Sequence, residues 1–357
     1  IACAAAALLA VERVETATAR TPWGDPDIQG VWTSEPELGV PFERAERFGT
    51  RQELTDQEFS ERQAQAERQL QNDVAEFDVE TANTANAGSV GSATSPPPHW
   101  LERGTPSRRT SMVIEPANGR LPPMTPAAQS RRAPRRGVST NRNSEGPFDS
   151  WLDMGLYDRC ITRGVPGAIF PAIYNANTRI VQGPGYVAVT YEMIHETRII
   201  PIGGAAPLPD EHRQYIGDSR GRWEGDTLVV ESSNYREDST FRGSSANARL
   251  VERFTRVDDE TLRYEVTVND PATWTAPWTA ALNLKPQSDG MYEYACHEGN
   301  HAMRNILSGA RAAEKDGEPV EDRRCACSPP REMPAPVSTA RSAARRGAGA
   351  SAAPCDH

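Results

Sequence analysis

The stretch that best indicates the fold of this chain reads Trp223-Glu224-Gly225-Asp226-Thr227-Leu228-Val229-Val230-Glu231. Its centre, Glu224-Gly225-Asp226, is a turn, because glycine and aspartate adopt tight-turn backbone conformations at little cost. The run that follows is rich in β-branched residues, which favour strands. The stretch therefore predicts an antiparallel β-hairpin.

Strand patterns surround this hairpin on both sides. A second hairpin is predicted around Asp258-Asp259-Glu260. Predicted strands cover residues 30–33, 186–191, 197–202, 250–256, 262–268, 279–284 and 291–295. Because the strands after 186 follow one another without intervening helices, they predict a mainly β domain, an antiparallel meander forming a barrel or a sandwich.

One helix is predicted on each side of the strands. In the N-terminal helix, Thr55 and Glu58 form a capping box, and the apolar residues Phe59, Ala66, Leu70, Val74 and Phe77 recur at helical spacing. A C-terminal helix is predicted from His301 to about residue 314, with Asn300 as its cap. We expect the N-terminal part to wrap around the β domain and the C-terminal helix to pack against it.

The two ends differ in composition from the middle of the chain. Residues 1–19 resemble a secretory signal peptide truncated at its front, because residues 1–11 are apolar and Ala17-Thr18-Ala19 is an A-x-A cleavage site. The alternatives are a short buried helix and, less favoured, the end of a lipobox at Cys3. Residues 318–357 are rich in Ala, Arg, Pro and Ser, which predicts a disordered or frameshifted tail.

Two regions lie between these ends. Residues 20–150 hold the first helix and an Arg/Pro-rich segment, in which nine arginines and a single acid, Glu115, lie between Arg103 and Arg142. This segment is either an arm that binds anionic ligands or an extended stretch wrapped around an acidic body. Residues 151–317 form the predicted β domain with its C-terminal helix.

Charge and cysteine content limit the class of protein. The 357 residues carry a formal net charge of −10, which argues against a general nucleic-acid binder. No apolar run reaches the length of a transmembrane helix. Only Cys160 and Cys296 lie in the globular part, and export favours a disulfide between them over two buried thiols. The predicted location is periplasmic or extracellular.

Four strings of the chain resemble a large family of exported, β-rich bacterial proteins. They are Asp25-Pro26-Asp27-Ile28-Gln29-Gly30-Val31-Trp32-Thr33, Asp158-Arg159-Cys160-Ile161-Thr162-Arg163-Gly164, residues 221–231, and Tyr292-Glu293-Tyr294-Ala295-Cys296-His297-Glu298-Gly299-Asn300. The similarity runs from about Trp23 to Lys315, and the tail beyond departs from the family's usual ending. The resemblance implies an exported β protein and no particular activity.

His297-Glu298-Gly299-Asn300-His301 matches the H-E-x-x-H pattern of zinc hydrolases. That pattern works when one helix places both histidines on the same face, with the glutamate beside the metal-bound water. Glycine and asparagine are disfavoured inside helices, and with Asn300 as the cap His297 precedes the helix. A zinc hydrolase is therefore the minor alternative, and no metal site is predicted.

A second candidate cluster consists of Glu192, His195, Glu196 and Arg198. In an extended chain, Glu192, Glu196 and Arg198 share one face and His195 lies on the other, unless a turn intervenes. Such a cluster is either a general acid/base pair or a strand face with cross-strand ion pairs.

Polar and aromatic residues near the turns are candidates for substrate binding. Asp218, Arg220 and Trp223 adjoin the first hairpin, while Tyr264, Trp274 and Trp278 form an aromatic set near Pro271 and Pro277. Aromatic rings at such positions stack on sugar or phenolic ligands, or else fill the core. The chain has no P-loop, dinucleotide fingerprint or G-x-S-x-G, so no cofactor is predicted.

Two functional hypotheses of different classes follow. In the first, a small organic or glycan-derived substrate meets an acid/base site, with His195 and His297 as proton carriers, Glu192 and Glu298 assisting, and Arg198 holding an anionic group. In the second, the protein is a non-catalytic, lipocalin-like ligand-binding or envelope protein whose aromatic residues line an apolar pocket. Neither hypothesis indicates an oligomeric state.

Overall fold

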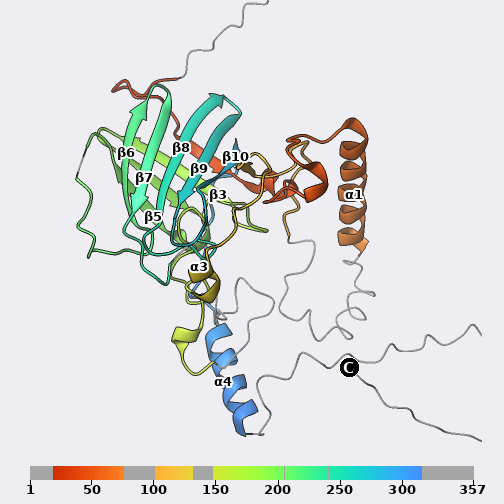
Figure 1. Cartoon of the computed structure of the whole chain (residues 1–357), viewed down its shortest axis with the longest axis vertical. Coiled ribbons are helices and arrows are strands. Elements are labelled where there is room, and N and C mark those ends of the chain that lie inside the picture. The colour runs from red at the N-terminus through yellow and green to blue at the C-terminus, as the bar shows by residue number, and fades with distance from the viewer. Residues whose placement is uncertain (1–18, 76–100, 132–147, 205, 240, 316–357) are drawn as a thin grey trace, which may run out of the picture.

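The computed structural model of the chain describes residues 19–75, 101–131, 148–204, 206–239 and 241–315 (Figure 1). Residues 1–18 of the predicted signal peptide and the whole predicted tail lie outside these ranges. Export and the nature of the tail therefore stay predictions. Within the described residues no helix is both long and apolar enough to cross a membrane.

The described residues form one antiparallel sheet of ten strands, in the order β5-β4-β3-β1-β10-β9-β8-β7-β6, with β2 also paired to β10. The strands are β1 (Gly30–Thr33), β2 (Val113–Glu115), β3 (Asn177–Gly183), β4 (Tyr186–Tyr191), β5 (Thr197–Pro201), β6 (Asp218–Glu224), β7 (Thr227–Ser233), β8 (Arg249–Asp258), β9 (Thr261–Asn269) and β10 (Trp278–Pro286). The mainly β, antiparallel prediction is confirmed.

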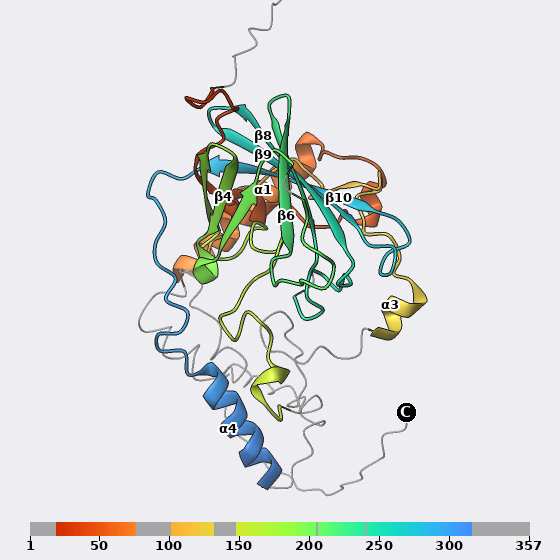
Figure 2. The ribbon, with the colours of Figure 1, turned by 90° about the vertical axis from the view of Figure 1, so that its left-hand side faces the viewer.

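The sheet curves until its two edge strands meet, as Figures 1 and 2 show. Just beyond β5, Ile202 forms a parallel bridge with Gly221 of β6, and the Gly203 N–H donates to the Gly221 carbonyl at 3.3 Å. A Cβ on Gly221 would lie 2.4 Å from Ile202 Cδ1, so a larger residue here would force the Ile202 side chain to shift. The sheet is thus barrel-like and nearly closed, rather than an open sandwich.

Alternate side chains of each strand fill the interior. Leu228 of β7, Phe254 of β8 and Tyr264 of β9 are fully buried and adjacent in register. Ile180 and Val189 face them from β3 and β4 as part of the same core cluster. Burying each such apolar side chain stabilises the fold by about 1.5–3 kcal/mol. Because successive side chains of a strand point to opposite faces, the alternation of apolar residues along the strands largely determines which of them form the core.

The predicted hairpins are confirmed, but one predicted strand is wrong. β6 and β7 pair with Trp223 opposite Leu228, around the predicted turn. Residues 291–295 form no strand. Of the residues of β10, only the last two pair with β1. The Tyr292 N–H donates to the Glu192 carboxylate and so has a side chain, not a strand, as its partner. The pattern also missed β3, which pairs with β1 and β4.

Helices lie outside the sheet (Figure 1). Those described are α1 (Asp56–Ala75), α3 (Pro126–Arg131) and α4 (Ala302–Lys315), with short 3-10 turns η1 (Glu35–Gly39), η2 (Glu46–Phe48), η4 (Trp151–Asp153) and η5 (Met193–His195). The capping box of α1 forms, because Thr55 N–H donates to Glu58 at 2.9 Å and Glu58 N–H to Thr55 Oγ1 at 3.3 Å. Phe77 lies outside the described residues.

The expected packing of the C-terminal helix on the strands is wrong. α4 extends away from the barrel in both views of the ribbon. Arg311 donates to the Phe148 carbonyl at 2.5 Å and lies 4.0 Å from Asp149, so α4 is held by the segment that leads into η4. No side chain of α4 is fully buried.

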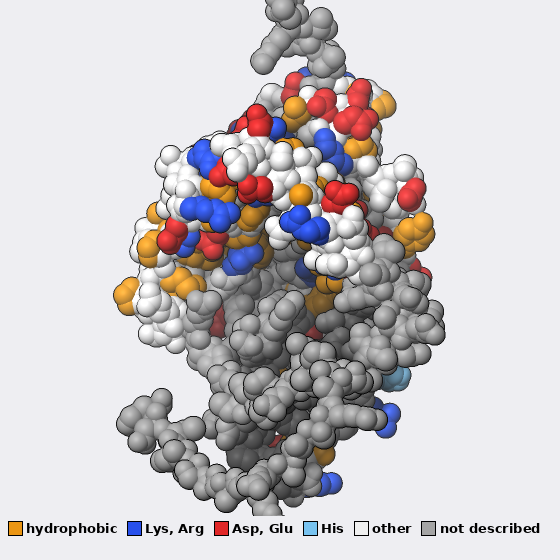
Figure 3. Space-filling view, turned by 90° about the vertical axis from the view of Figure 1, so that its right-hand side faces the viewer, with side chains coloured by type: hydrophobic (Ala, Val, Ile, Leu, Met, Phe, Trp, Pro, Cys, Tyr) orange, Lys and Arg blue, Asp and Glu red, His pale blue; other side chains and the backbone are white. Residues whose placement is uncertain are grey.

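The described part of the Arg/Pro-rich segment lies along the body of the protein. β2 pairs with β10, and ion pairs join arginines of this segment to acids of the N-terminal part: Arg103–Asp73, Arg108–Asp56, Arg109–Glu37 and Arg120–Glu46. Basic and acidic side chains are interspersed on the side of the molecule that carries α1 (Figure 3). These contacts place the described part of the segment against β10 and against acids of the N-terminal part, while its role stays a prediction.

A disulfide joins Cys160 and Cys296 across 136 residues of chain, with the Cα atoms 5.8 Å apart. The predicted pairing is confirmed. Neither Cys160 nor Cys296 lies in a strand or helix, so the bond joins two irregular segments.

Replacing both cysteines by serine should lower the free energy of unfolding by about 2–5 kcal/mol, since the unfolded chain regains the freedom that a long loop loses on closure. Urea unfolding followed by tryptophan fluorescence measures this change. The wild type in reductant should unfold like the Cys160→Ser/Cys296→Ser variant. An unchanged urea midpoint in the variant would show that the bond does not stabilise the fold.

Candidate functional site

Three segments that carry most of the candidate residues meet at one end of the barrel. This end, where η5 connects β4 to β5, is called the barrel end below. Thr162 donates to Glu196 at 2.5 Å, and the Tyr292 N–H donates to Glu192 at 2.9 Å. Together with the disulfide, these contacts bring residues 157–163, 192–196 and 292–300 to one place.

Three tyrosine hydroxyls converge at the barrel end. The hydroxyl of Tyr157 lies 3.0 Å from that of Tyr174 and 3.0 Å from that of Tyr294. The rings of Tyr174 and Tyr294 are nearly parallel, at 8°, with centroids 6.5 Å apart. Three hydroxyls carry three protons and the two contacts use two, so one O–H remains to donate to another group. These three residues are called the tyrosine cluster.

Arg163 lies against the tyrosine cluster. Its guanidinium is 5.5 Å from the centroid of the Tyr157 ring, and its Nη1 donates to Met193 Sδ at 3.0 Å. No carboxylate of the described residues forms an ion pair with Arg163. Burial lowers the pKa of Arg163, and only the tyrosine cluster acts in the opposite direction. A half-buried guanidinium without a carboxylate partner is a suitable place for an anionic ligand.

The tyrosines of the cluster act as neutral donors. Burial, reinforced by the neighbouring hydroxyls, raises the pKa of Tyr157 far above its ordinary value. Burial also raises the pKa of Tyr294. Both phenols therefore stay protonated at neutral pH, and they suit hydrogen bonding to an anion rather than proton abstraction.

The second candidate cluster does not form one acid/base pair. Ile194 and His195 adopt positive φ, 68° and 60°, so the chain turns sharply before β5. His195 points to solvent. Glu192 is buried and accepts hydrogen bonds from Asn177 Nδ2 at 2.7 Å and from the Tyr292 N–H, so its carboxylate holds the barrel end together.

Glu196 has a different environment from Glu192. It is half-buried, and burial raises its pKa, although the hydrogen bond from Thr162 and the charge of Arg198 act in the opposite direction. Its carboxylate fixes the loop of residues 160–164 to the start of β5.

The H-E-x-x-H string lies before α4 rather than within it. His297, Glu298 and His301 are exposed, and α4 begins at Ala302, whose N–H donates to Asn300 Oδ1 at 3.1 Å. The two histidines therefore do not share a helix face. Among the described residues, no group of three or more His, Cys, Asp or Glu side chains is arranged to hold a metal ion.

Arg198 pairs with an acid that sequence reasoning missed. Its two terminal nitrogens donate to both oxygens of Glu252 on β8, at 2.5 and 3.0 Å. Arg198 is 2% exposed and Glu252 is not exposed at all. Tyr264 donates to Glu252 at 3.0 Å, and Ser232 lies 3.5 Å from the other oxygen. Arg198 is thus committed to the barrel interior, where it cannot hold an external anion.

Burial and the charge of Glu252 together set the pKa values inside this network. Burial alone would lower the pKa of Arg198, but the adjacent Glu252 carboxylate raises it. Burial, and then Glu252, raise the pKa of Tyr264. The interior therefore holds a bidentate arginine–glutamate contact beside a phenol that stays protonated, which is a structural arrangement rather than a proton-transfer site.

The candidates for substrate binding are mostly structural. Tyr264, Trp274 and Trp278 are buried in the core, and Trp223 packs against it. Asp218 pairs with Arg220 at 2.5 Å and accepts from the Leu208 N–H, so the pair fixes the loop before β6. The aromatic set fills the interior instead of lining a pocket.

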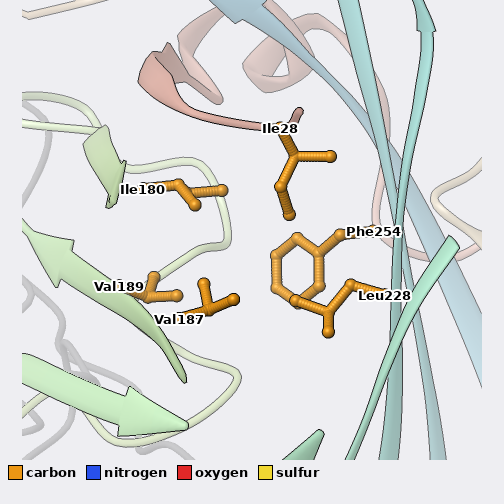
Figure 4. A pocket seen from close by; sticks show the side chains of 6 residues that line it. All are labelled: Ile28, Ile180, Val187, Val189, Leu228 and Phe254. Atoms are coloured by element: carbon orange, nitrogen blue, oxygen red, sulfur yellow. The ribbon is translucent and has the colours of Figure 1, made fainter. Parts of the chain in front are cut away.

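Figure 4 shows the small apolar cavity inside the barrel. Six side chains line it: Ile28, Ile180, Val187, Val189, Leu228 and Phe254. The space between these atoms amounts to about 120 Å³, and none of it is wide enough for a water molecule. A lipocalin-like ligand would not fit here without displacing core side chains.

Sequence reasoning missed Tyr157, Tyr174 and the role of Arg163. Arg163 and Tyr294 do lie within three residues of the two cysteines that were expected to pair. That spacing was the signal in the sequence that could have placed Arg163 and Tyr294 near each other, because a disulfide brings together the residues that flank its two cysteines.

No family model, no curated protein and no solved structure matched this chain. The function is therefore proposed from the chemistry of the site.

Glu252→Gln should lower the free energy of unfolding by about 3–5 kcal/mol, because it leaves Arg198 buried without a counter-charge. Replacing both partners, as Arg198→Met with Glu252→Leu, should recover most of this loss. Urea unfolding monitored by circular dichroism measures the free energy of unfolding of the wild type, of Glu252→Gln and of the double variant.

The matched control is the exposed pair Arg222–Glu231, whose side chains are 49% and 58% exposed. Glu231→Gln should change stability by less than about 1 kcal/mol. Equal losses for Glu252→Gln and Glu231→Gln would contradict the structural importance of the buried pair.

Proposed function

We propose that this chain is an exported, non-catalytic binding protein that holds a small, carboxylate-bearing, glycan-derived ligand at the barrel end. The observation that carries the proposal is Arg163, a half-buried guanidinium that lies 5.5 Å from the centroid of the Tyr157 ring and forms no ion pair with a described carboxylate. The disulfide supports the export part of the proposal, because such bonds persist in oxidising compartments.

The chemistry of the barrel end favours a carboxylate. A guanidinium presents parallel N–H donors that match the two oxygens of a carboxylate. Arg163 adds one positive charge, which a monoanion neutralises. The remaining O–H of the tyrosine cluster supplies a further donor.

An exposed aromatic ring favours a sugar as the rest of the ligand. Tyr292 is 67% exposed and lies on a segment of the barrel end. Aromatic faces stack on sugar rings, while their edges leave hydroxyl groups in water. Hexuronic acids combine such a ring with a carboxylate.

Acid/base catalysis is less favoured. The proton carriers of that hypothesis, His195 and His297, are both exposed, and Glu298 is exposed beside His297. Glu192 and Arg198 are buried and engaged with other partners. The described residues therefore do not gather a histidine and a carboxylate in one cavity.

Isothermal titration calorimetry with galacturonate, glucuronate and neutral galactose tests the proposal. We expect both uronates to bind and galactose not to bind. Arg163→Met should weaken uronate binding by about tenfold or more, since a charged hydrogen-bonded contact is worth about 1.5–3 kcal/mol. Tyr157→Phe should weaken it less, because one neutral donor is lost.

The matched control is Arg179→Met, which removes an exposed arginine from the outer face of β3. It should bind uronates like the wild type. The proposal fails if uronates and galactose behave alike, or if the two arginine variants have the same affinity.

A further inference from the structure

α4 has an apolar face that the rest of the described chain leaves partly uncovered. Its apolar residues recur at intervals of three and four and are half-buried: Met303, Ile306, Leu307, Ala310 and Ala313. Such spacing places them in one stripe along the helix. A helix that belonged to the core would bury this stripe fully, yet no residue of α4 is buried.

Two further apolar side chains lie next to α4. Trp151 and Leu152 of η4 are 50% and 63% exposed. Both ribbon views place η4 beside α4, and Arg311 joins α4 to the chain just before η4. The stripe of α4, Trp151 and Leu152 are together called the α4 surface.

The charge of α4 is opposite to that of the chain as a whole. Arg304 and Lys315 are exposed and basic, and Arg311, also exposed, is engaged by Glu314 at 3.4 Å and by Asp149 at 4.0 Å. Glu314 is the only acid of the helix. The whole chain carries a formal net charge of −10. At 100° per residue Arg304 and Lys315 lie together on one flank of the apolar stripe, as in helices that lie on anionic membranes.

We infer that the α4 surface binds the surface of an anionic phospholipid membrane, with α4 lying in the plane of the interface. The helix has 14 residues, which span about 21 Å and are too few to cross a bilayer core of about 30 Å. Apolar side chains enter the acyl boundary, Trp151 sits at the headgroup level, and the basic flank meets lipid phosphates.

A second copy of the chain fits this surface less well than lipid does. Two α4 surfaces packed face to face would bring their basic flanks near each other, and like charges repel. An anionic membrane provides an apolar layer and negative charge at the same time. The inference does not depend on the ligand proposed for the barrel end.

Co-sedimentation of the full chain with phospholipid vesicles tests the inference. We expect binding to phosphatidylcholine vesicles that contain about one quarter phosphatidylglycerol, much weaker binding to pure phosphatidylcholine, and release by salt. Ile306→Ser with Leu307→Ser should reduce the bound fraction at least about fivefold, because it removes the two largest apolar groups of α4.

Two other variants separate the contributions of the basic residues and of Trp151 to vesicle binding. Arg304→Glu with Lys315→Glu should abolish the preference for anionic vesicles, and Trp151→Ala should weaken binding without changing that preference. Ile199→Ser is the matched control, since Ile199 is 57% exposed on β5, away from α4. Circular dichroism should show that all variants keep the wild-type fold, because every substituted side chain is at least partly exposed.

Three results would overturn the inference. One is equal binding to neutral and anionic vesicles, or none to either. Another is that the double serine variant binds like Ile199→Ser. The third is that the wild type is a dimer in the absence of lipid and the double serine variant a monomer, which would assign the α4 surface to a second copy of the chain.

Discussion

The buried ion pair between Arg198 and Glu252 is the interaction on which the arrangement of the barrel depends. It joins β5, at one edge of the sheet, to β8 on the opposite side of the interior. Beyond it, the edge strands meet at the Ile202–Gly221 bridge. Two opposite charges without access to water have to face each other, so the pair restricts how far the sheet can open.

Filling the interior determines where a ligand can bind. Many small barrels bind ligands between their walls, but here core side chains and the ion pair fill the described interior around a narrow apolar cavity. The groups of the proposed binding site, Arg163 and the tyrosine cluster, lie outside the barrel wall, at the barrel end. There the disulfide keeps Tyr157 and Arg163 near Tyr294, although 130 or more residues separate the two segments.

The barrel end and the α4 surface are adjacent along the chain but differ in character. The first contains a guanidinium and phenol hydroxyls, while the second contains an apolar stripe flanked by basic residues. The segment of residues 287–301 contributes to the first site and leads into α4. Contacts that hold it in position include the disulfide, the Tyr157–Tyr294 hydrogen bond and the Tyr292–Glu192 hydrogen bond.

Local patterns in the sequence determined the hairpins and the cap of α1, because turns, caps and alternating burial depend on neighbouring residues. The cysteine pair followed from the cysteine count, since only Cys160 and Cys296 lie in the globular part. Only the tertiary structure decided the partner of Arg198, since Glu252 lies 54 residues away and its pairing depends on closure of the sheet. The same reason applies to the tyrosine cluster. Its three hydroxyls belong to distant segments, and their meeting follows from the disulfide and the barrel rather than from any local pattern.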